Sequence, residues 1–167
     1  MHIRLEGRAR LLGDDVNTDY IIASTRKRDT LDEQILKRYL LETLDPSFAE
    51  SVQPGDILVA GSNFGCGSAM EVAATVLLAA GFKAVVARSF SRTFFRNAVN
   101  NGLMPVECDT LGIREGDRLV IIADDRGVRV DDMTQGTHLI ALPFPDTIRM
   151  ILSAPGLIEV VRRKAWT

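Results

Sequence analysis

Apolar and polar residues recur along the chain with two different periods. From Ile3 to Leu12 they alternate, which predicts a strand with one solvent-facing side. Short apolar runs at residues 56–60 and 83–88 predict two buried strands. The Ala- and Leu-rich segment 72–80, which ends at Gly81, predicts a buried helix between them. This order is that of a βαβ unit with parallel strands.

The remaining periodic segments complete an α/β pattern. Residues 31–44 have helical spacing, with one apolar face formed by Leu31, Ile35, Tyr39 and Leu40. Further helices are predicted at residues 91–101, 146–152 and 157–164, and further strands at 104–108, 118–123, 127–130 and 138–142. We therefore expect an α/β fold with a central βαβ unit and a smaller β-rich part, in one domain spanning residues 1–167.

Three polar segments have neither period and are predicted to be loops. Residues 13–19 are rich in Asp and Asn, whose side chains hydrogen-bond their own backbone in turns. Residues 24–30 are polar and basic, and residues 45–55 connect the predicted helix to the first buried strand.

The segment between that strand and its helix, residues 61–71, is predicted to be an active-site loop. Gly65 and Gly67 allow positive φ angles and a close approach of the backbone to a ligand. Ser68 is expected at or near the helix N-cap, where free N–H groups favour a carboxylate, a phosphate or a serine alkoxide. The alternative is that Ser68 only caps the helix, since serine is a common N-cap residue. Three glycines within seven residues favour the functional interpretation.

Composition restricts the chemistry that these residues support. The net charge of −2 gives no general field for nucleic acid or an anionic membrane. Cys66 and Cys108 are far apart, which suits a reducing cytoplasm, and two thiolates do not hold an iron–sulfur cluster. With only His2 and His138, neither a histidine-based zinc site nor a Ser-His-Asp triad is expected. No membrane span or signal peptide is apparent, so we expect a cytoplasmic protein.

Two nucleotide-binding motifs share features with the glycine-rich segment 61–71. A phosphate-binding P-loop requires a lysine that this loop lacks. A dinucleotide fold is the more serious alternative, because Gly65-x-Gly67 precedes a helix and the next strand ends in Arg88. The third glycine of that motif would fall on Met70, whose side chain opposes close packing of helix and strand.

Two groups of cations are further candidates for ligand contacts. Arg26, Lys27 and Arg28 form either a solvated charge run or a set of carboxylate contacts. Arg92 and Arg96 share one face of their predicted helix, and pairing with acidic neighbours is as reasonable for them as ligand contact.

Three motifs together resemble a known family. They are Asp-Asp-Val-Asn-Thr-Asp at residues 14–19, Gly-Ser-Asn-Phe-Gly-Cys-Gly-Ser at residues 61–68, and the stretch 84–103. This pattern resembles the small subunits of 3-isopropylmalate dehydratase, homoaconitase and 2,3-dimethylmalate dehydratase, and the swivelling domain of aconitase. The resemblance covers residues 1–165 and is most specific in Asn-Phe-Gly-Cys-Gly-Ser.

The resemblance implies a swivelling β/β/α domain that closes over a separate large subunit, in a heterodimer or heterotetramer. The partner would hold a [4Fe–4S] cluster, and the pair would isomerise a 2-hydroxy di- or tricarboxylic acid by dehydration and rehydration. The substrate first expected is 3-isopropylmalate, in leucine biosynthesis, with the other two family substrates as alternatives. A non-catalytic partner or an NADP-binding domain would be the alternatives of a different class.

The resemblance also assigns roles to residues. Ser68 matches the catalytic serine base of the family, next to Gly67. The family pattern continues Ser-Arg-Glu, whereas this chain has Ala69 and Met70 before its glutamate, so a substrate-binding arginine is missing. The family's specificity loop, which corresponds to residues 21–28, also departs from the family pattern, and Arg26, Lys27 or Arg28 can supply the missing charge. The substrate-binding residues expected are therefore Thr25, Arg26, Lys27, Arg28, Gly67 and Ser68.

Overall fold

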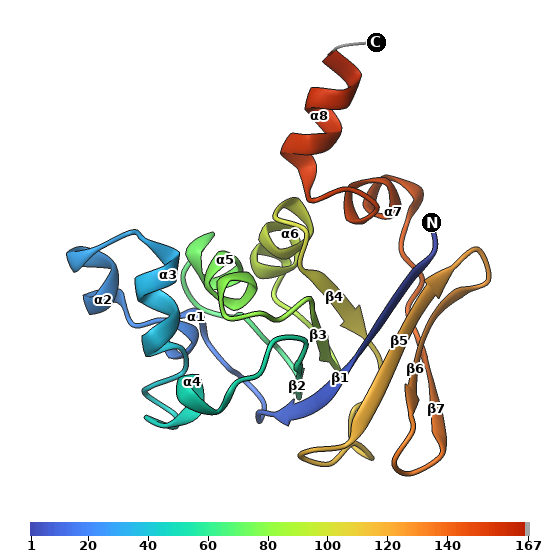
Figure 1. Cartoon of the computed structure of the whole chain (residues 1–167), viewed down its shortest axis with the longest axis horizontal. Coiled ribbons are helices and arrows are strands. Elements are labelled where there is room, and N and C mark those ends of the chain that lie inside the picture. The colour runs from blue at the N-terminus through green and yellow to red at the C-terminus, as the bar shows by residue number, and fades with distance from the viewer. Residues whose placement is uncertain (166–167) are drawn as a thin grey trace.

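A seven-stranded mixed sheet runs through the computed structural model, which describes residues 1–165 (Figure 1). Its strands are β1 (Ile3–Leu11), β2 (Ile57–Ala60), β3 (Ala84–Ala87), β4 (Met104–Glu107), β5 (Arg118–Asp124), β6 (Gly127–Asp132) and β7 (Thr137–Ala141). The predicted strands are therefore confirmed, with small changes at their ends.

The strand order is β4-β3-β2-β1-β5-β6-β7. Strands β1 to β4 are parallel, with Ala9 opposite Ile57 and Leu58 opposite Val85, whereas β5, β6 and β7 are antiparallel to their neighbours. The βαβ unit and the β-rich second part are thus confirmed. After β7, the N–H of Leu142 donates to the carbonyl oxygen of Glu107 at 2.9 Å, so the curled sheet brings its two edges together.

Nine helical segments accompany the sheet in the described part of the chain. They are α1 (Thr18–Ile21), α2 (Ser24–Asp29), α3 (Glu33–Leu36), η1 (Lys37–Tyr39), α4 (Phe48–Ser51), α5 (Val72–Ala79), α6 (Arg92–Asn100), α7 (Asp146–Leu152) and α8 (Leu157–Ala165). The first five gather beside α5, and α8 projects away from the body of the molecule (Figure 1). Within residues 1–165 no helix has the length and apolar character needed to cross a bilayer.

The alternation along β2 divides the interior into two cores. Leu58 and Ala60 face a core formed mainly with α1, α3 and α5, whereas Ile57 and Val59 face a second core formed mainly with β5 to β7. All four residues are buried, since both faces of this strand are covered. The continuous apolar run at residues 56–60 therefore reflects a strand between two layers.

The structure corrects three predictions in the first third of the chain. Residues 24–30 were expected to be a loop but contain α2, and the segment 45–55 contains α4. The helix expected over residues 31–44 is short and broken, because Leu41 has a φ of 57° and starts a new turn. Its buried side chains are Leu36, Leu40 and Leu41, while Leu31 is 77% exposed.

A charged cluster holds the segment before β2 against β1. The carboxylate of Asp56 accepts from Arg8 at 2.9 Å, from Arg10 at 3.3 Å and from the N–H of Gln53 at 3.0 Å. Burial acts to raise the pKa of the Asp56 carboxyl, but these three donors outweigh it and hold the pKa below its usual value. Because Asp56 is only 3% exposed, the fold depends on this charge being compensated.

Candidate active site

Three segments far apart in sequence meet around the glycine loop, which is residues 61–68. The N–H of Thr18 donates to the carbonyl oxygen of Cys66 at 2.8 Å, and the N–H of Gly65 donates to Val16 at 2.7 Å. On the other side, the N–H of Phe64 donates to the carbonyl oxygen of Ser89 at 3.0 Å. The loop is therefore held between the turn after β1 and the segment after β3, at the carboxyl ends of the parallel strands, where α/β folds commonly bind ligands.

Two glycines in this loop have the positive φ angles that the sequence predicted. Gly65 has a φ of 75°, and a Cβ atom placed on it would lie 2.2 Å from Cγ of Phe94. Gly67 has a φ of 89°, but a Cβ there would find its nearest neighbour, Cγ of Asn17, at 3.4 Å. Gly65 is thus required by both conformation and close packing, and Gly67 by conformation alone.

Side chains from the neighbouring segments fix the start of the loop. Asp14 Oδ1 accepts the N–H of Ser62 at 2.7 Å and a guanidinium hydrogen of Arg88 at 2.5 Å. The Ser62 N–H and then Arg88 lower the pKa of the Asp14 carboxyl, which keeps it ionised as an acceptor. Asn63 donates its N–H to Ser89 Oγ at 2.8 Å.

Ser68 is exposed at the end of this loop and does not cap α5. The N-cap residue is Glu71, and the N–H of Ala73 reaches back to the carbonyl oxygen of Met70 at 3.3 Å, so the chain makes an extra turn before the helix. Ser68 was expected at or near the N-cap and lies three residues before it, so the alternative that Ser68 only caps the helix is wrong. Its carbonyl oxygen instead accepts the hydroxyl hydrogen of buried Thr18 at 3.0 Å.

The backbone around Ser68 offers unused hydrogen-bond donors. Within the described part of the chain, the N–H groups of residues 67–71 donate to no protein acceptor. Gly67, Ser68 and Ala69 are all exposed, so a ligand that reaches Ser68 also reaches these donors. Free backbone N–H groups are suited to bind anionic oxygens.

The α2 cations differ in what they contact. Arg26 forms two hydrogen bonds to the Glu42 carboxylate, at 2.8 and 2.9 Å, and its guanidinium lies 3.9 Å from the ring centre of Tyr39. Lys27 Nζ contacts the sulfur of Met70, so α2 brings one cation to the turn that follows the glycine loop. Arg28 and Thr25 are exposed. The structure thus brings Lys27 next to the Ser68 segment and directs Arg26 to a partner within the chain.

Sequence reasoning did not identify Thr18 or Ser91 as supports of the site. Thr18 lies within the Asp- and Asn-rich stretch that was predicted only to form a turn. Ser91 caps α6 and donates its hydroxyl hydrogen to the carbonyl oxygen of Gly65 at 2.6 Å. A cap residue before α6 was recognisable from the sequence, but its contact with a loop 26 residues away was not.

Neither cysteine lies in a metal-binding arrangement. Cys66 is half-buried in the glycine loop, and Cys108 is buried, which raises the pKa of its thiol to about 11 with help from the charge of Asp109. Among residues 1–165, no group of three or more His, Cys, Asp or Glu side chains is placed to hold a metal ion. The described residues therefore do not fit an iron–sulfur cluster.

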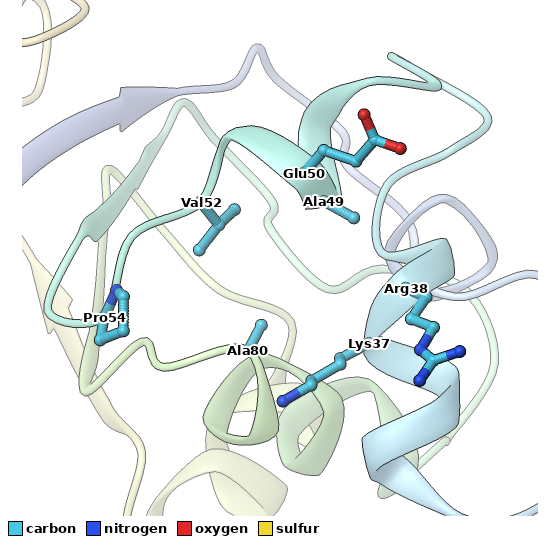
Figure 2. A pocket seen from close by; sticks show the side chains of 7 residues that line it. All are labelled: Lys37, Arg38, Ala49, Glu50, Val52, Pro54 and Ala80. Atoms are coloured by element: carbon cyan, nitrogen blue, oxygen red, sulfur yellow. The ribbon is translucent and has the colours of Figure 1, made fainter.

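A cavity of about 420 Å³ lies elsewhere, between η1, α4 and the end of α5 (Figure 2). It is lined by Lys37, Arg38, Ala49, Glu50, Val52, Pro54 and Ala80. Pro54 precedes β2 and Ala80 follows α5, whereas Ser68 lies between the end of β2 and the start of α5. The cavity is thus at the opposite end of the βαβ unit and does not belong to the candidate active site.

Comparison with known proteins identifies the family. The model of the aconitase C-terminal domain matches residues 17–111, a range that contains the glycine loop, α2 and α6. The chain belongs to the aconitase C-terminal domain family.

Two relatives at more than 40% identity are named as dehydratase small subunits. "3-isopropylmalate dehydratase small subunit 1" of Methanopyrus kandleri is 43% identical over 160 residues, covering 96% of this chain and 94% of the relative. The 3-isopropylmalate dehydratase small subunit of Caldanaerobacter subterraneus is 42% identical, covering 96% and 99%. These matches favour the dehydratase interpretation over a dinucleotide-binding domain.

A solved structure supports the same assignment of fold. The 3-isopropylmalate dehydratase LeuD of Methanocaldococcus jannaschii superposes with a TM-score of 0.90 at 36% identity, covering 98% of this chain and 96% of that one. The predicted family and fold class are both confirmed.

Proposed function

We propose that this chain is the small subunit of a 3-isopropylmalate dehydratase, a hydro-lyase that moves a hydroxyl group between neighbouring carbons by dehydration and rehydration. It would act in the cytoplasm, as one swivelling domain, with a separate large subunit that holds a [4Fe–4S] cluster. The names of relatives that cover nearly the whole chain support the substrate. The observation that carries the catalytic role is the exposed position of Ser68 among unused backbone donors.

In this proposal Ser68 is the general base. Its hydroxyl oxygen would remove the proton from the carbon next to a substrate carboxylate, and return a proton there in the reverse direction. A neutral serine is a weak base, so the reaction needs groups that stabilise the alkoxide form. The unused N–H groups of residues 67–71 are suited to this purpose, because backbone donors fixed before the reaction lower the cost of a developing oxyanion.

The cations of α2 would hold the substrate carboxylates. Lys27 lies against Met70, and Arg28 is exposed on the same short helix. Thr25 and Gly67 would complete the contacts. Arg26, which the sequence suggested as a direct contact, would act by fixing α2 through Glu42 and Tyr39.

The test is reconstitution with the cognate large subunit under anaerobic conditions. The pair should isomerise 3-isopropylmalate, while the isolated chain, after treatment with iron and sulfide, should show neither a stoichiometric cluster spectrum nor activity. A panel of 2-hydroxy diacids with methyl, dimethyl and carboxyalkyl groups would identify a different family substrate. An active isolated chain that carries a cluster would contradict the two-subunit proposal.

The role of Ser68 is tested by Ser68→Ala in the reconstituted pair. Loss of a general base should lower kcat by roughly 10²–10⁴-fold, with subunit association and cluster content unchanged. Ser62→Ala, in the same loop, is the matched control, because the contact of Ser62 with Asp14 uses its backbone N–H. Near-normal kcat in Ser68→Ala would exclude Ser68 as the base.

A further inference from the structure

A second cleft lies between α6 and the carboxyl ends of β3 and β4. It has a volume of about 350 Å³ and is lined by Phe90, Arg92, Phe95, Arg96 and Glu107. Arg92 and Arg96 are exposed and one helical turn apart, so they flank the cleft together. The sequence left open whether they pair with acidic neighbours. Among the side chains that the structure describes, neither guanidinium forms an ion pair.

The charge of this cleft is positive, although the chain as a whole carries −2. Its acidic residue, Glu107, accepts the N–H of Phe90 at 3.3 Å and offsets one of the two guanidinium charges. The floor is aromatic, with the rings of Phe90 and Phe95 edge to face at 6.1 Å. Both rings are half-buried, and arginine beside partly exposed aromatic rings is a composition that protein–protein interfaces favour.

Aromatic packing joins this cleft to the glycine loop. Phe64, in that loop, packs edge-on against Phe90 at 6.0 Å and against Phe94 at 5.0 Å between ring centres. The hydroxyl of Ser91, next to Phe90, binds the carbonyl oxygen of Gly65. A partner bound in the cleft would therefore be connected to the segment that carries Ser68 by packed aromatic rings and one hydrogen bond.

The cleft also shares its side of the sheet with Ser68. Phe90 follows β3, Glu107 ends β4, and the glycine loop follows β2, so all three lie at the carboxyl ends of parallel strands. A large subunit that covers Ser68 must approach this rim of the sheet. This step rests on the proposed function, in which such a subunit exists.

We propose that the cleft docks an acidic segment of the large subunit, one that places a carboxylate between Arg92 and Arg96 and an apolar side chain on Phe90 and Phe95. Two unpaired guanidinium groups suit a carboxylate through bidentate hydrogen bonds. The aromatic floor requires an apolar group, which an inorganic anion lacks. The volume of about 350 Å³ also accommodates side chains of a protein segment rather than a single phosphate.

The test measures the affinity between this chain and the reconstituted large subunit at low and high salt. Arg92→Glu/Arg96→Glu should raise Kd roughly 30-fold or more at low salt, as expected when close interfacial charge pairs are reversed. Lys83→Glu/Arg126→Glu is the control, because both residues are exposed at the opposite rim and the change in net charge is the same. The control should bind like the wild type, and thermal unfolding should confirm that both variants are folded.

Three outcomes would overturn the proposal or separate it from the proposed function. Equal Kd values for wild type and Arg92→Glu/Arg96→Glu would exclude docking at this cleft. Micromolar binding of inorganic phosphate to the isolated chain, lost in that variant while subunit affinity is unchanged, would make the cleft a small-anion site. If the wild-type pair binds tightly but acts on no 2-hydroxy acid, the proposed function is contradicted. The docking proposal is then still supported if Arg92→Glu/Arg96→Glu weakens binding.

Discussion

The hydroxyl of Thr18 donates to the carbonyl oxygen of Ser68 at 3.0 Å, which ties the first turn of α1 to the end of the glycine loop. Thr18 is 1% exposed, and its own N–H donates to the carbonyl oxygen of Cys66 in the same loop. One buried residue thus fixes the backbone on both sides of Gly67. The position of Ser68 therefore depends on Thr18 as well as on the glycines.

Thr18→Val should lower kcat by roughly 10- to 100-fold, because small misplacements of a reacting group have effects of this size. The loss of one hydrogen bond should also lower the free energy of unfolding by about 1 kcal/mol. Thr18→Ser keeps the hydroxyl and should restore most of kcat. Steady-state kinetics on the reconstituted pair and urea unfolding provide the measurements, and an unchanged kcat in Thr18→Val would show that Ser68 is positioned without this tether.

Substitutions in α2 should distinguish residues that bind the substrate from the residue that holds the helix in place. Arg28→Ala and Lys27→Met should lower kcat/KM by the equivalent of roughly 2–5 kcal/mol, mainly through KM, since each removes a charged contact to a carboxylate. Arg38→Ala, an exposed arginine at the cavity of Figure 2, is the control and should leave kcat/KM unchanged. If all variants stay within about twofold of wild type, α2 is only a solvated helix.

Arg26→Ala should behave differently from its two neighbours in α2. Its guanidinium forms an ion pair with Glu42 and lies over the ring of Tyr39, so the variant should have a free energy of unfolding about 1 kcal/mol lower. Glu42→Gln should cause a similar loss if the ion pair is responsible. A large rise in KM for Arg26→Ala with unchanged KM in Glu42→Gln would instead identify Arg26 as a direct substrate contact.

The two glycines of the active-site loop should differ in their tolerance of alanine. Gly67→Ala should cost about 1–2 kcal/mol, the usual penalty for a Cβ at positive φ. Gly65→Ala should cost about 3 kcal/mol or more, because its Cβ would also meet the ring of Phe94 at 2.2 Å. Chemical denaturation of both variants checks the order, and equal losses would mean that the Phe94 ring moves freely.

Asp56 should contribute to stability at neutral pH and lose that contribution in acid. Its folded-state pKa is held below the usual value, so the folded state favours the ionised form. Stabilisation is therefore complete above the unfolded pKa of about 4 and disappears as the pH falls through the lower folded value. Asp56→Asn should cost about 3 kcal/mol at pH 7 and less at pH 3. Urea unfolding at both pH values tests this, and the same loss at each would contradict it.

The sequence predicted the elements whose pattern is determined by their own residues. Strand β2 is apolar throughout because both of its faces are covered. Gly81, which the sequence marked as the end of the helix, follows α5 and its C-cap Ala80 and has a positive φ of 105°. The glycine loop was recognisable because Gly65 and Gly67 have positive φ angles, which glycine adopts more readily than other residues. The assignment to the family followed from three motifs that the structure brings together.

The features that were missed depend on contacts between distant residues. Helix α2 has no apolar face, and Arg26 is held through Glu42, 16 residues away. The predicted helix over residues 31–44 does not continue past Tyr39, and the N–H of Leu41 donates to the carbonyl oxygen of Ile21 at 3.0 Å, a partner outside any local pattern. The role of Thr18 likewise required knowing that residue 68 lies beside it.

The central place of β1 in the sheet has a consequence for the order of folding. The strand spans Ile3–Leu11, yet its neighbours are β2, which begins at Ile57, and β5, which begins at Arg118. During synthesis, more than a hundred residues must therefore be added after β1 before its second edge can pair with β5. Such long-range pairing favours slow folding. A fragment that stops short of Arg118 would leave this edge open to other chains, and we expect such fragments to aggregate or to require a chaperone.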